Sequence, residues 1–152
     1  MRTIKREIVS ALIFSKDGKL LMGKKDPAKG GVYAECWHLP GGGIDEGENK
    51  EQALVREVKE ETNLDIGSLK QELVDDTAWG QSEKVLKDTG EKVLCNMHFN
   101  VYKVNLSSDS LNIELQPTDD LVELKWIGMD ELKKVKLTPP SEKLFSKILL
   151  KP

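Results

Sequence analysis

The segment Lys50–Thr62 restricts the fold more than any other part of the chain, because it predicts one well-defined helix. It is rich in Glu, Gln, Ala, Leu, Lys and Arg, which are good helix formers. The next residue, Asn63, tolerates the left-handed backbone conformation in which many helices end. We therefore expect a central helix over Lys50–Thr62 that ends at Asn63.

Three carboxylates of this helix share one narrow face. At about 100° per residue, Glu57, Glu60 and Glu61 fall close together and border the apolar face that would be buried. Like charges at this spacing destabilise a helix, more so when they are partly desolvated. Oxygen ligands of this kind suit a hard divalent cation such as Mg²⁺ or Mn²⁺. The alternative is an ordinary solvated acidic face, and the helix alone does not exclude it.

The length and the charge balance narrow the classes of protein. With 152 residues the chain has the size of one domain, so we expect a single domain over residues 1–152. The 23 basic and 26 acidic residues give a net charge of −3. A binder of duplex nucleic acid usually carries a basic excess, so we expect no stable nucleic-acid complex. A small anionic ligand remains compatible with this balance, in a monomer or a homodimer.

Neither a membrane nor a secreted location is indicated. The longest uncharged run, Val93–Tyr102, has ten residues, whereas a spanning helix needs about 20. Cys36 and Cys95 are isolated, with no metal-binding or disulfide spacing. We therefore expect no membrane partner and a cytoplasmic location.

Strands dominate the rest of the chain. Apolar runs and turn residues predict a hairpin of Ile8–Phe14 and Leu20–Gly23, and a stop to regular structure at 40–43. A short C-terminal helix is expected over Glu142–Leu149. The remaining extended segments are Trp37–Leu39, Ser68–Trp79, Glu83–Lys87, Lys92–Asn105 and Leu121–Ile127. These elements predict an α+β fold or an α/β/α sandwich.

The spacing around the helix favours the metal interpretation. Gly42 is followed after five residues by Glu48, and after seven more by the run Arg56–Glu61, with apolar Leu64 beyond. At average residue frequencies this spacing arises by chance with a probability on the order of 10⁻⁶. A solvated acidic face does not explain it.

Gly42–Leu64 resembles the Nudix box, G-x5-E-x7-R-E-U-x-E-E-x-G-U with U apolar, and departs from it only at Asn63, where Gly is expected. The box covers 23 of the 152 residues. The resemblance implies a Nudix-type α/β/α sandwich with a mixed central sheet, a catalytic loop–helix–loop and a C-terminal helix. It also implies a metal-dependent enzyme that hydrolyses the pyrophosphate linkage of a nucleoside diphosphate derivative.

The resemblance also implies roles for individual residues. Glu57, Glu60 and Glu61 are the expected carboxylate ligands of Mg²⁺ or Mn²⁺, joined by the backbone carbonyl of Gly41. Glu48 is expected as a further ligand or a proton-handling residue. Arg56 is expected to position a carboxylate, most simply by a charge-assisted pair with Glu48 or a box glutamate.

Two further residues outside the box are candidates for substrate binding. Lys25, at the end of the second strand, stands where related proteins often have a basic phosphate contact. Asp120 precedes the strand that ends near Trp126 and is a candidate acidic ligand or base, in competition with Asp119 and Glu123.

The substrate is predicted by elimination among the classes of the resembling family. Trp79 stands where enzymes acting on ADP-ribose tend to have proline, and Gly80 and Gln81 stand where enzymes acting on diadenosine polyphosphates tend to have tyrosine. A (deoxy)nucleoside triphosphate, cleaved to the monophosphate and pyrophosphate, is therefore the first expectation. The alternatives are ADP-ribose, a nucleotide sugar, a dinucleoside polyphosphate, or a non-catalytic nucleotide-binding module.

Overall fold

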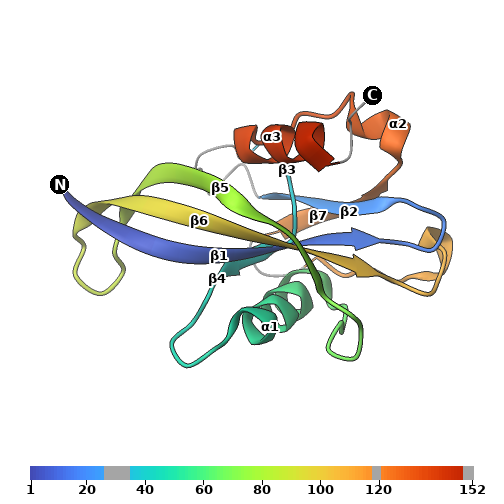
Figure 1. The fold of residues 1–152 in the computed structure, drawn as a ribbon, viewed down its shortest axis with the longest axis horizontal. Helices are drawn as coiled ribbons and strands as arrows, with labels where there is room; N and C mark the ends of the chain where they lie inside the picture. The colour runs from blue at the N-terminus through green and yellow to red at the C-terminus, as the bar shows by residue number, and fades with distance from the viewer. Residues whose placement is uncertain (26–34, 118–120, 149–152) are drawn as a thin grey trace.

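The computed structural model describes residues 1–25, 35–117 and 121–148. Its strands and helices follow one another as shown in Figure 1. The strands are β1 (Arg2–Phe14), β2 (Leu20–Lys25), β3 (Trp37–His38), β4 (Gly41–Gly43), β5 (Glu72–Val85), β6 (Lys92–Asn105) and β7 (Leu121–Ile127). The helices are α1 (Lys50–Thr62), α2 (Met129–Leu132) and α3 (Pro139–Ile148), with a 3₁₀ turn at Ser110–Asn112.

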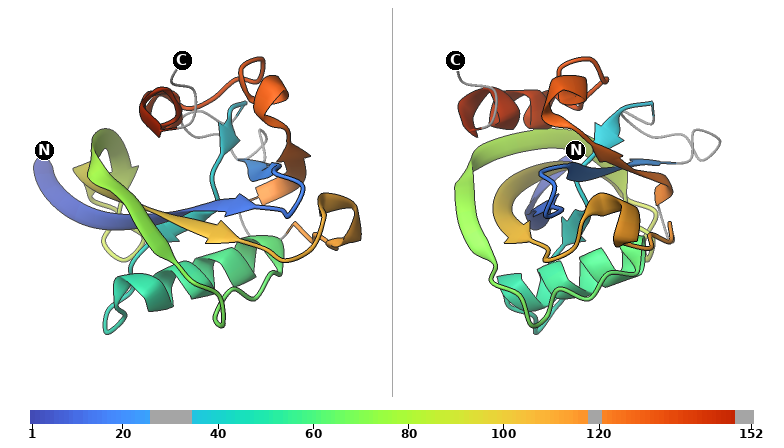
Figure 2. Two further views of the ribbon diagram at one scale, coloured as in Figure 1. Left: turned by 45° about the vertical axis from the view of Figure 1, so that its right-hand side comes forward. Right: turned by 90° about the vertical axis from the view of Figure 1, so that its right-hand side faces the viewer.

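The described strands form one mixed sheet in the order β3-β2-β1-β6-β5, with β4 paired to β1 and β7 paired to β2. β1 and β6 run parallel over their whole length, whereas the other pairs are antiparallel. Helix α1 lies on one side of the sheet and α3 on the other (Figure 2). This arrangement confirms the predicted α/β/α sandwich.

Alternation along β1 divides the core between the two faces of the sheet. Val9, Ala11 and Ile13 are fully buried in one apolar cluster, which includes Leu54 and Val58 of α1. Leu12 points to the other face, where its cluster includes Leu144 and Phe145 of α3. Each helix therefore packs through an apolar stripe on its own face of the sheet.

The boundaries of α1 follow from its caps. The side chain of Asn49 accepts a hydrogen bond from the backbone N–H of Gln52, and the Gln52 side chain accepts one from the Asn49 N–H. This reciprocal arrangement satisfies two backbone donors that a helix start leaves unpaired. Asn63 has φ 65° and its N–H donates to the carbonyl of Lys59, so the helix ends where expected.

Several parts of the secondary structure differ from the sequence-based expectation. Gly41–Gly43 were expected to stop regular structure, but they form β4, antiparallel to Ile8–Ser10 of β1. Strand β1 begins at Arg2 instead of Ile8, because its polar first half pairs with β6. The two extended segments expected around residues 68–87 are one strand, β5, in which Gly80 stays paired with Met97.

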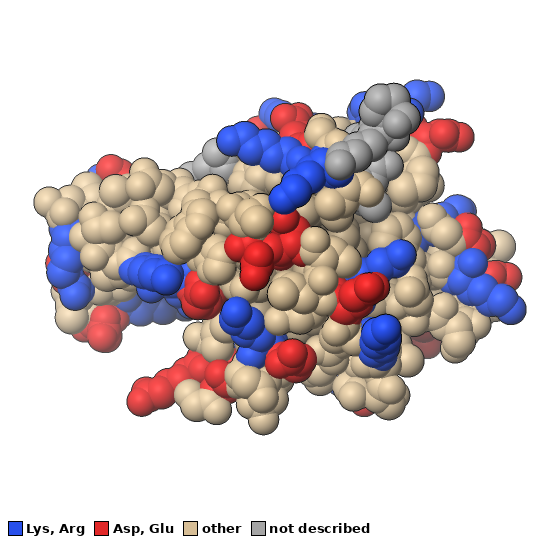
Figure 3. Space-filling model, in the orientation of Figure 1, with Lys and Arg blue, Asp and Glu red and all other residues tan. Residues whose placement is uncertain are grey.

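The C-terminal helix and the surface complete the fold. α3 spans Pro139–Ile148 and so begins three residues before the expected Glu142. Proline fits the first helical turn, because that turn does not need its N–H groups. Among the described residues no helix is long and apolar enough to cross a membrane. Acidic and basic side chains are interspersed over the face of the molecule in Figure 3, as expected for the nearly balanced charge.

Candidate active site

The site is built where the glycines of β4 meet the carboxylate face of α1. The backbone N–H of Gly41 donates to Oε1 of Glu61 at 2.8 Å. A Cβ atom at Gly42 would lie only 2.6 Å from Cδ and Oε1 of Glu57. A side chain at Gly42 would therefore displace this carboxylate, and one at Gly41 would overlap the backbone of Val9 and Ser10 in β1. The glycines let two carboxylates lie directly against the backbone of β4.

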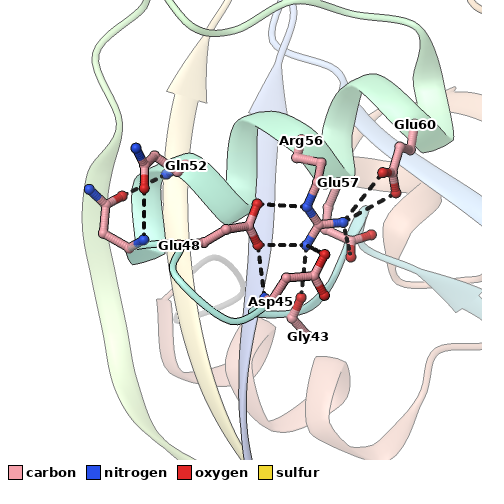
Figure 4. A network of polar contacts seen from close by, with 8 residues as sticks. Gly43, Asp45, Glu48, Gln52, Arg56, Glu57 and Glu60 are labelled. Atoms are coloured by element: carbon pink, nitrogen blue, oxygen red, sulfur yellow. Dashed lines mark hydrogen bonds and ion pairs between the residues drawn. The ribbon is translucent and has the colours of Figure 1, made fainter.

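Arg56 holds the loop between β4 and α1 in place (Figure 4). Its Nε donates to Oε2 of Glu48 at 2.7 Å and its Nη2 donates to Oε1 at 2.9 Å. This two-point contact is the strong, planar form of an arginine–carboxylate pair. Nη2 also donates to the carbonyl of Gly43 at 3.0 Å, and Oε1 of Glu48 accepts from the Asp45 N–H at 2.8 Å. The predicted pair of Arg56 with Glu48 is thus present, together with two loop contacts that the sequence did not indicate.

Arg56 also reaches the carboxylates of its own helix. Nη1 donates to Glu57 at 3.0 Å and lies 3.3 Å from Oε2 of Glu60. The Glu57 side chain is 13% exposed, whereas that of Glu60 is 44% exposed. Glu61 is buried. The three carboxylates therefore differ in environment, from a buried acceptor beside β4 to a half-exposed group beside Arg56.

The electrostatics of the Arg56–Glu48 pair favour the charged forms of both groups. The hydrogen bonds from Arg56 and from the backbone of Asp45 hold the pKa of Glu48 below its ordinary range. The hydrogen bond to Glu48 raises the pKa of Arg56 well above its ordinary value. Both groups are therefore ionised throughout the neutral range.

The donor atoms fit a hard divalent cation in kind. Glu57, Glu60, Glu61 and the backbone of Gly41 offer only oxygen ligands, the type that Mg²⁺ and Mn²⁺ prefer. The side chains of Glu57 and Glu61 both lie against β4. Among the described residues no three His, Cys, Asp or Glu side chains form a ready-made ligand cluster. Glu60 would have to turn from Arg56 to join the other two.

Of the residues predicted outside the box, the structure describes Lys25 and Glu123. Lys25 ends β2, as expected, and is exposed. Asp120 and Asp119 lie outside the described residues. Glu123 lies in β7 opposite Lys24. The roles given to these residues stay predictions.

Comparisons with known proteins agree with this architecture. A family model described as NUDIX domain matches residues 4–148. Nucleoside triphosphatase NudI of Escherichia coli is 30% identical over 132 residues, which cover 84% of each chain. An RNA pyrophosphohydrolase of Hydrogenovibrio crunogenus is 40% identical over 60 residues, which cover 40% of this chain and only a third of that protein.

A solved structure supports the fold independently. The E. coli dihydroneopterin triphosphate pyrophosphohydrolase superposes with a TM-score of 0.68 over 96% of both chains, at 16% identity. At that identity the likeness concerns the fold alone. The family match spans nearly the whole chain and confirms the resemblance of Gly42–Leu64 to the Nudix box. The chain belongs to the Nudix family, and the enzyme class that its relatives support is a Nudix pyrophosphohydrolase.

Proposed function

We propose that the protein hydrolyses (deoxy)nucleoside triphosphates to the monophosphate and pyrophosphate, with Mg²⁺ or Mn²⁺ as cofactor. The observation that carries the proposal is the placement of Glu57 and Glu61 against Gly42 and Gly41 of β4. This places two carboxylates at a strand edge that no other described strand covers. The relative named nucleoside triphosphatase, which matches over most of both chains, supports the choice of a triphosphate.

Different residues of the chain would have different roles in such a reaction. Divalent cations, when bound, neutralise the crowded phosphate oxygens and lower the pKa of a water nucleophile. Glu57, Glu60 and Glu61 would hold them. Arg56 keeps Glu48 and the carbonyl of Gly43 at fixed positions beside these carboxylates. This preorganisation is how a protein stabilises a charged transition state without rearranging during the reaction.

Other substrates share the anhydride bond and remain alternatives. ADP-ribose, a nucleotide sugar and a dinucleoside polyphosphate each contain it, and so does the triphosphate end of an RNA. A non-catalytic nucleotide-binding module is the alternative from another class. Such a module has no need of a complete set of box carboxylates, whereas this chain retains Glu48, Glu57, Glu60 and Glu61.

A substrate panel tests the proposal. Protein treated with EDTA and dialysed is incubated with each substrate class, without metal and with added Mg²⁺ or Mn²⁺, and the released phosphate and pyrophosphate are measured. We expect no turnover without metal, and pyrophosphate release from at least one nucleoside triphosphate when metal is returned. Full activity in a metal-free sample would contradict the mechanism. Nucleotide binding without turnover of any substrate would support the non-catalytic alternative.

A further inference from the structure

A second arginine lies against the catalytic loop, on the side of β4 away from the carboxylates. Arg6 belongs to β1, two residues before Ile8, which pairs with Gly43. A Cβ atom at Gly43 would overlap Nη2 of Arg6 and would lie 2.8 Å from its Cζ. Because successive residues of a strand point to opposite faces, Gly42 faces Glu57 and Gly43 faces Arg6. The three residues of β4 therefore separate the carboxylates from this guanidinium.

The two arginines beside Gly43 differ in their partners. Arg56 is neutralised by the carboxylates of Glu48, Glu57 and Glu60. Arg6 is half-buried, yet within the described ranges it makes no hydrogen bond and no ion pair. A guanidinium carries five N–H donors, and withdrawing it from water without an acceptor is unfavourable. An anion that binds beside Gly43 would satisfy these donors.

The surrounding surface has the charge that an anion requires. Strands β1, β6 and β5 extend beyond the body of the molecule as an arm (Figure 1). Alternation places Arg2, Arg6 and Lys84 on the same face of this arm as Ile4, Ile8, Cys95 and Met97. No carboxylate of β1, β6 or the segment Ala78–Val85 of β5 points to that face.

Lys84 adds to the positive charge on this face of the arm. Burial and the nearby charge of Arg6 lower its pKa, and within the part of the chain that the structure describes it has no ion-pair partner. Arg2, by contrast, is paired with Glu91 at 2.8 Å. Among the described residues, two cations without an ion pair thus lie on this face of the arm, and Arg6 is the one that touches the catalytic loop.

We propose that Arg6 binds the terminal phosphate of the substrate, the one farthest from the nucleoside. The inference rests on the proposed function, which places the scissile anhydride at Glu57 and Glu61. Among the described strands β4 pairs only with β1, and its other edge is lined by Glu61 and Arg56, which contact Gly41 and Gly43. When a triphosphate lies across this edge, its central phosphates face the carboxylates and its terminal phosphate contacts Arg6. Arg6 thereby favours substrates that end in a free phosphate over those that end in a sugar.

Steady-state kinetics on matched variants test this preference. Arg6→Met replaces the guanidinium by an uncharged, unbranched side chain, and Arg6→Lys keeps the charge. The control is Arg2→Met, on the same face of the same strand but exposed and paired with Glu91. For a nucleoside triphosphate we expect Arg6→Met to lower kcat/KM roughly ten- to hundredfold, mainly through KM. Arg6→Lys should recover part of the loss, and ADP-ribose turnover and the control should change less than threefold.

Binding of inorganic pyrophosphate, followed by calorimetry at a fixed Mg²⁺ concentration, tests the contact without turnover. Arg6→Met should weaken it at least tenfold relative to wild type and to Arg2→Met. Unchanged binding, or no measurable binding by wild type, would overturn the assignment of Arg6. An equal loss on all substrates together with a lower melting temperature would also overturn it, since that indicates a structural role. A further outcome separates the two proposals. If wild type hydrolyses no triphosphate but Arg6→Met still weakens the binding of pyrophosphate, the proposed function is wrong and the contact of Arg6 with a phosphate is supported.

Discussion

The carboxylate of Glu57 occupies the space that a side chain at residue 42 would need. A Cβ atom at Gly42 would come within 2.6 Å of both Cδ and Oε1 of Glu57. Real Cβ atoms do not approach other atoms so closely, so any larger residue would displace the carboxylate or separate α1 from β4. Gly42 is thus required for the contact between strand and helix that the proposed chemistry uses.

Gly42→Ala should therefore impair catalysis more than folding. We expect kcat to fall roughly 10²-fold, because a displacement of about 1 Å at a reacting centre has an effect of that size. Overpacking of this kind costs about 1–3 kcal/mol of stability. Gly128→Ala is the matched control, since a Cβ atom there meets no atom within 4 Å. Wild-type kcat in a folded Gly42→Ala protein would contradict the account.

Replacing a box carboxylate by its amide tests the role of the charge itself. Glu60→Gln and Glu61→Gln should each lower kcat by roughly 10²–10⁴ if the carboxylate supports several kcal/mol of transition-state stabilisation. The melting temperature should change little, because reduced repulsion between like charges offsets the weakened contacts with Arg56 and Gly41. Glu51→Gln, in the first turn of the same helix, is the control. If the two variants hydrolyse substrate as fast as wild type, the acidic face is an ordinary solvated surface without a role in catalysis.

The ion pair of Glu48 predicts a specific dependence of stability on pH. The hydrogen bonds from Arg56 and the Asp45 N–H lower the pKa of Glu48 in the folded state. A lowered folded-state pKa stabilises the protein at pH values above the unfolded pKa, and this stabilisation is lost as the pH falls through the folded pKa. Urea midpoints of wild type should exceed those of Glu48→Gln at pH 7. The difference should shrink as the pH falls below the ordinary carboxyl range; a constant difference down to pH 3 would contradict the pair.

An ion pair attaches α3 to the edge strand of the sheet. Nζ of Lys147 donates to Oδ1 of Asp75 at 2.7 Å, and the Asp75 side chain is only 5% exposed. Burial raises the pKa of Asp75, but the hydrogen bonds from Lys147 and Thr77 outweigh it and hold the pKa below its ordinary range. Lys147→Met leaves this buried carboxylate with a weaker partner, so we expect a loss of about 1–3 kcal/mol in urea unfolding. Lys143→Met, an exposed change on the same helix, should leave stability within about 0.5 kcal/mol. Equal urea unfolding midpoints for the two variants would contradict this interpretation.

The sequence predicted those elements whose residues determine their own local structure. Helix α1 has good helix formers, a capping asparagine and Asn63 at its end, and its bounds are those expected. Strands β6 and β7 also begin and end at the expected residues. In each case the local pattern and the tertiary packing favour the same conformation.

The remaining elements depend on partners that a sequence pattern does not reveal. Glycines usually interrupt a strand, yet Gly41–Gly43 form one because only residues without side chains fit between β1, Glu57 and Arg6. The polar stretch Arg2–Glu7 is a strand because β6 pairs with it. Arg6 had no distinguishing sequence signal, since its position depends on the pairing of β1 with β4. Box spacing predicted the carboxylates and the pairing of Arg56 with Glu48, whereas the contacts of Glu57 and Glu61 with β4 became visible only in the three-dimensional structure.

The most direct test of the central claim is the fate of the attacking water. A nucleoside triphosphate is hydrolysed with Mg²⁺ in ¹⁸O-labelled water, and the products are analysed by mass spectrometry. We predict attack at the β-phosphorus, so that the label enters pyrophosphate and the monophosphate stays unlabelled. Label in the monophosphate would place the attack at the α-phosphorus and correct that detail. Release of inorganic phosphate and a nucleoside diphosphate, or no hydrolysis of any triphosphate, would contradict the proposed function.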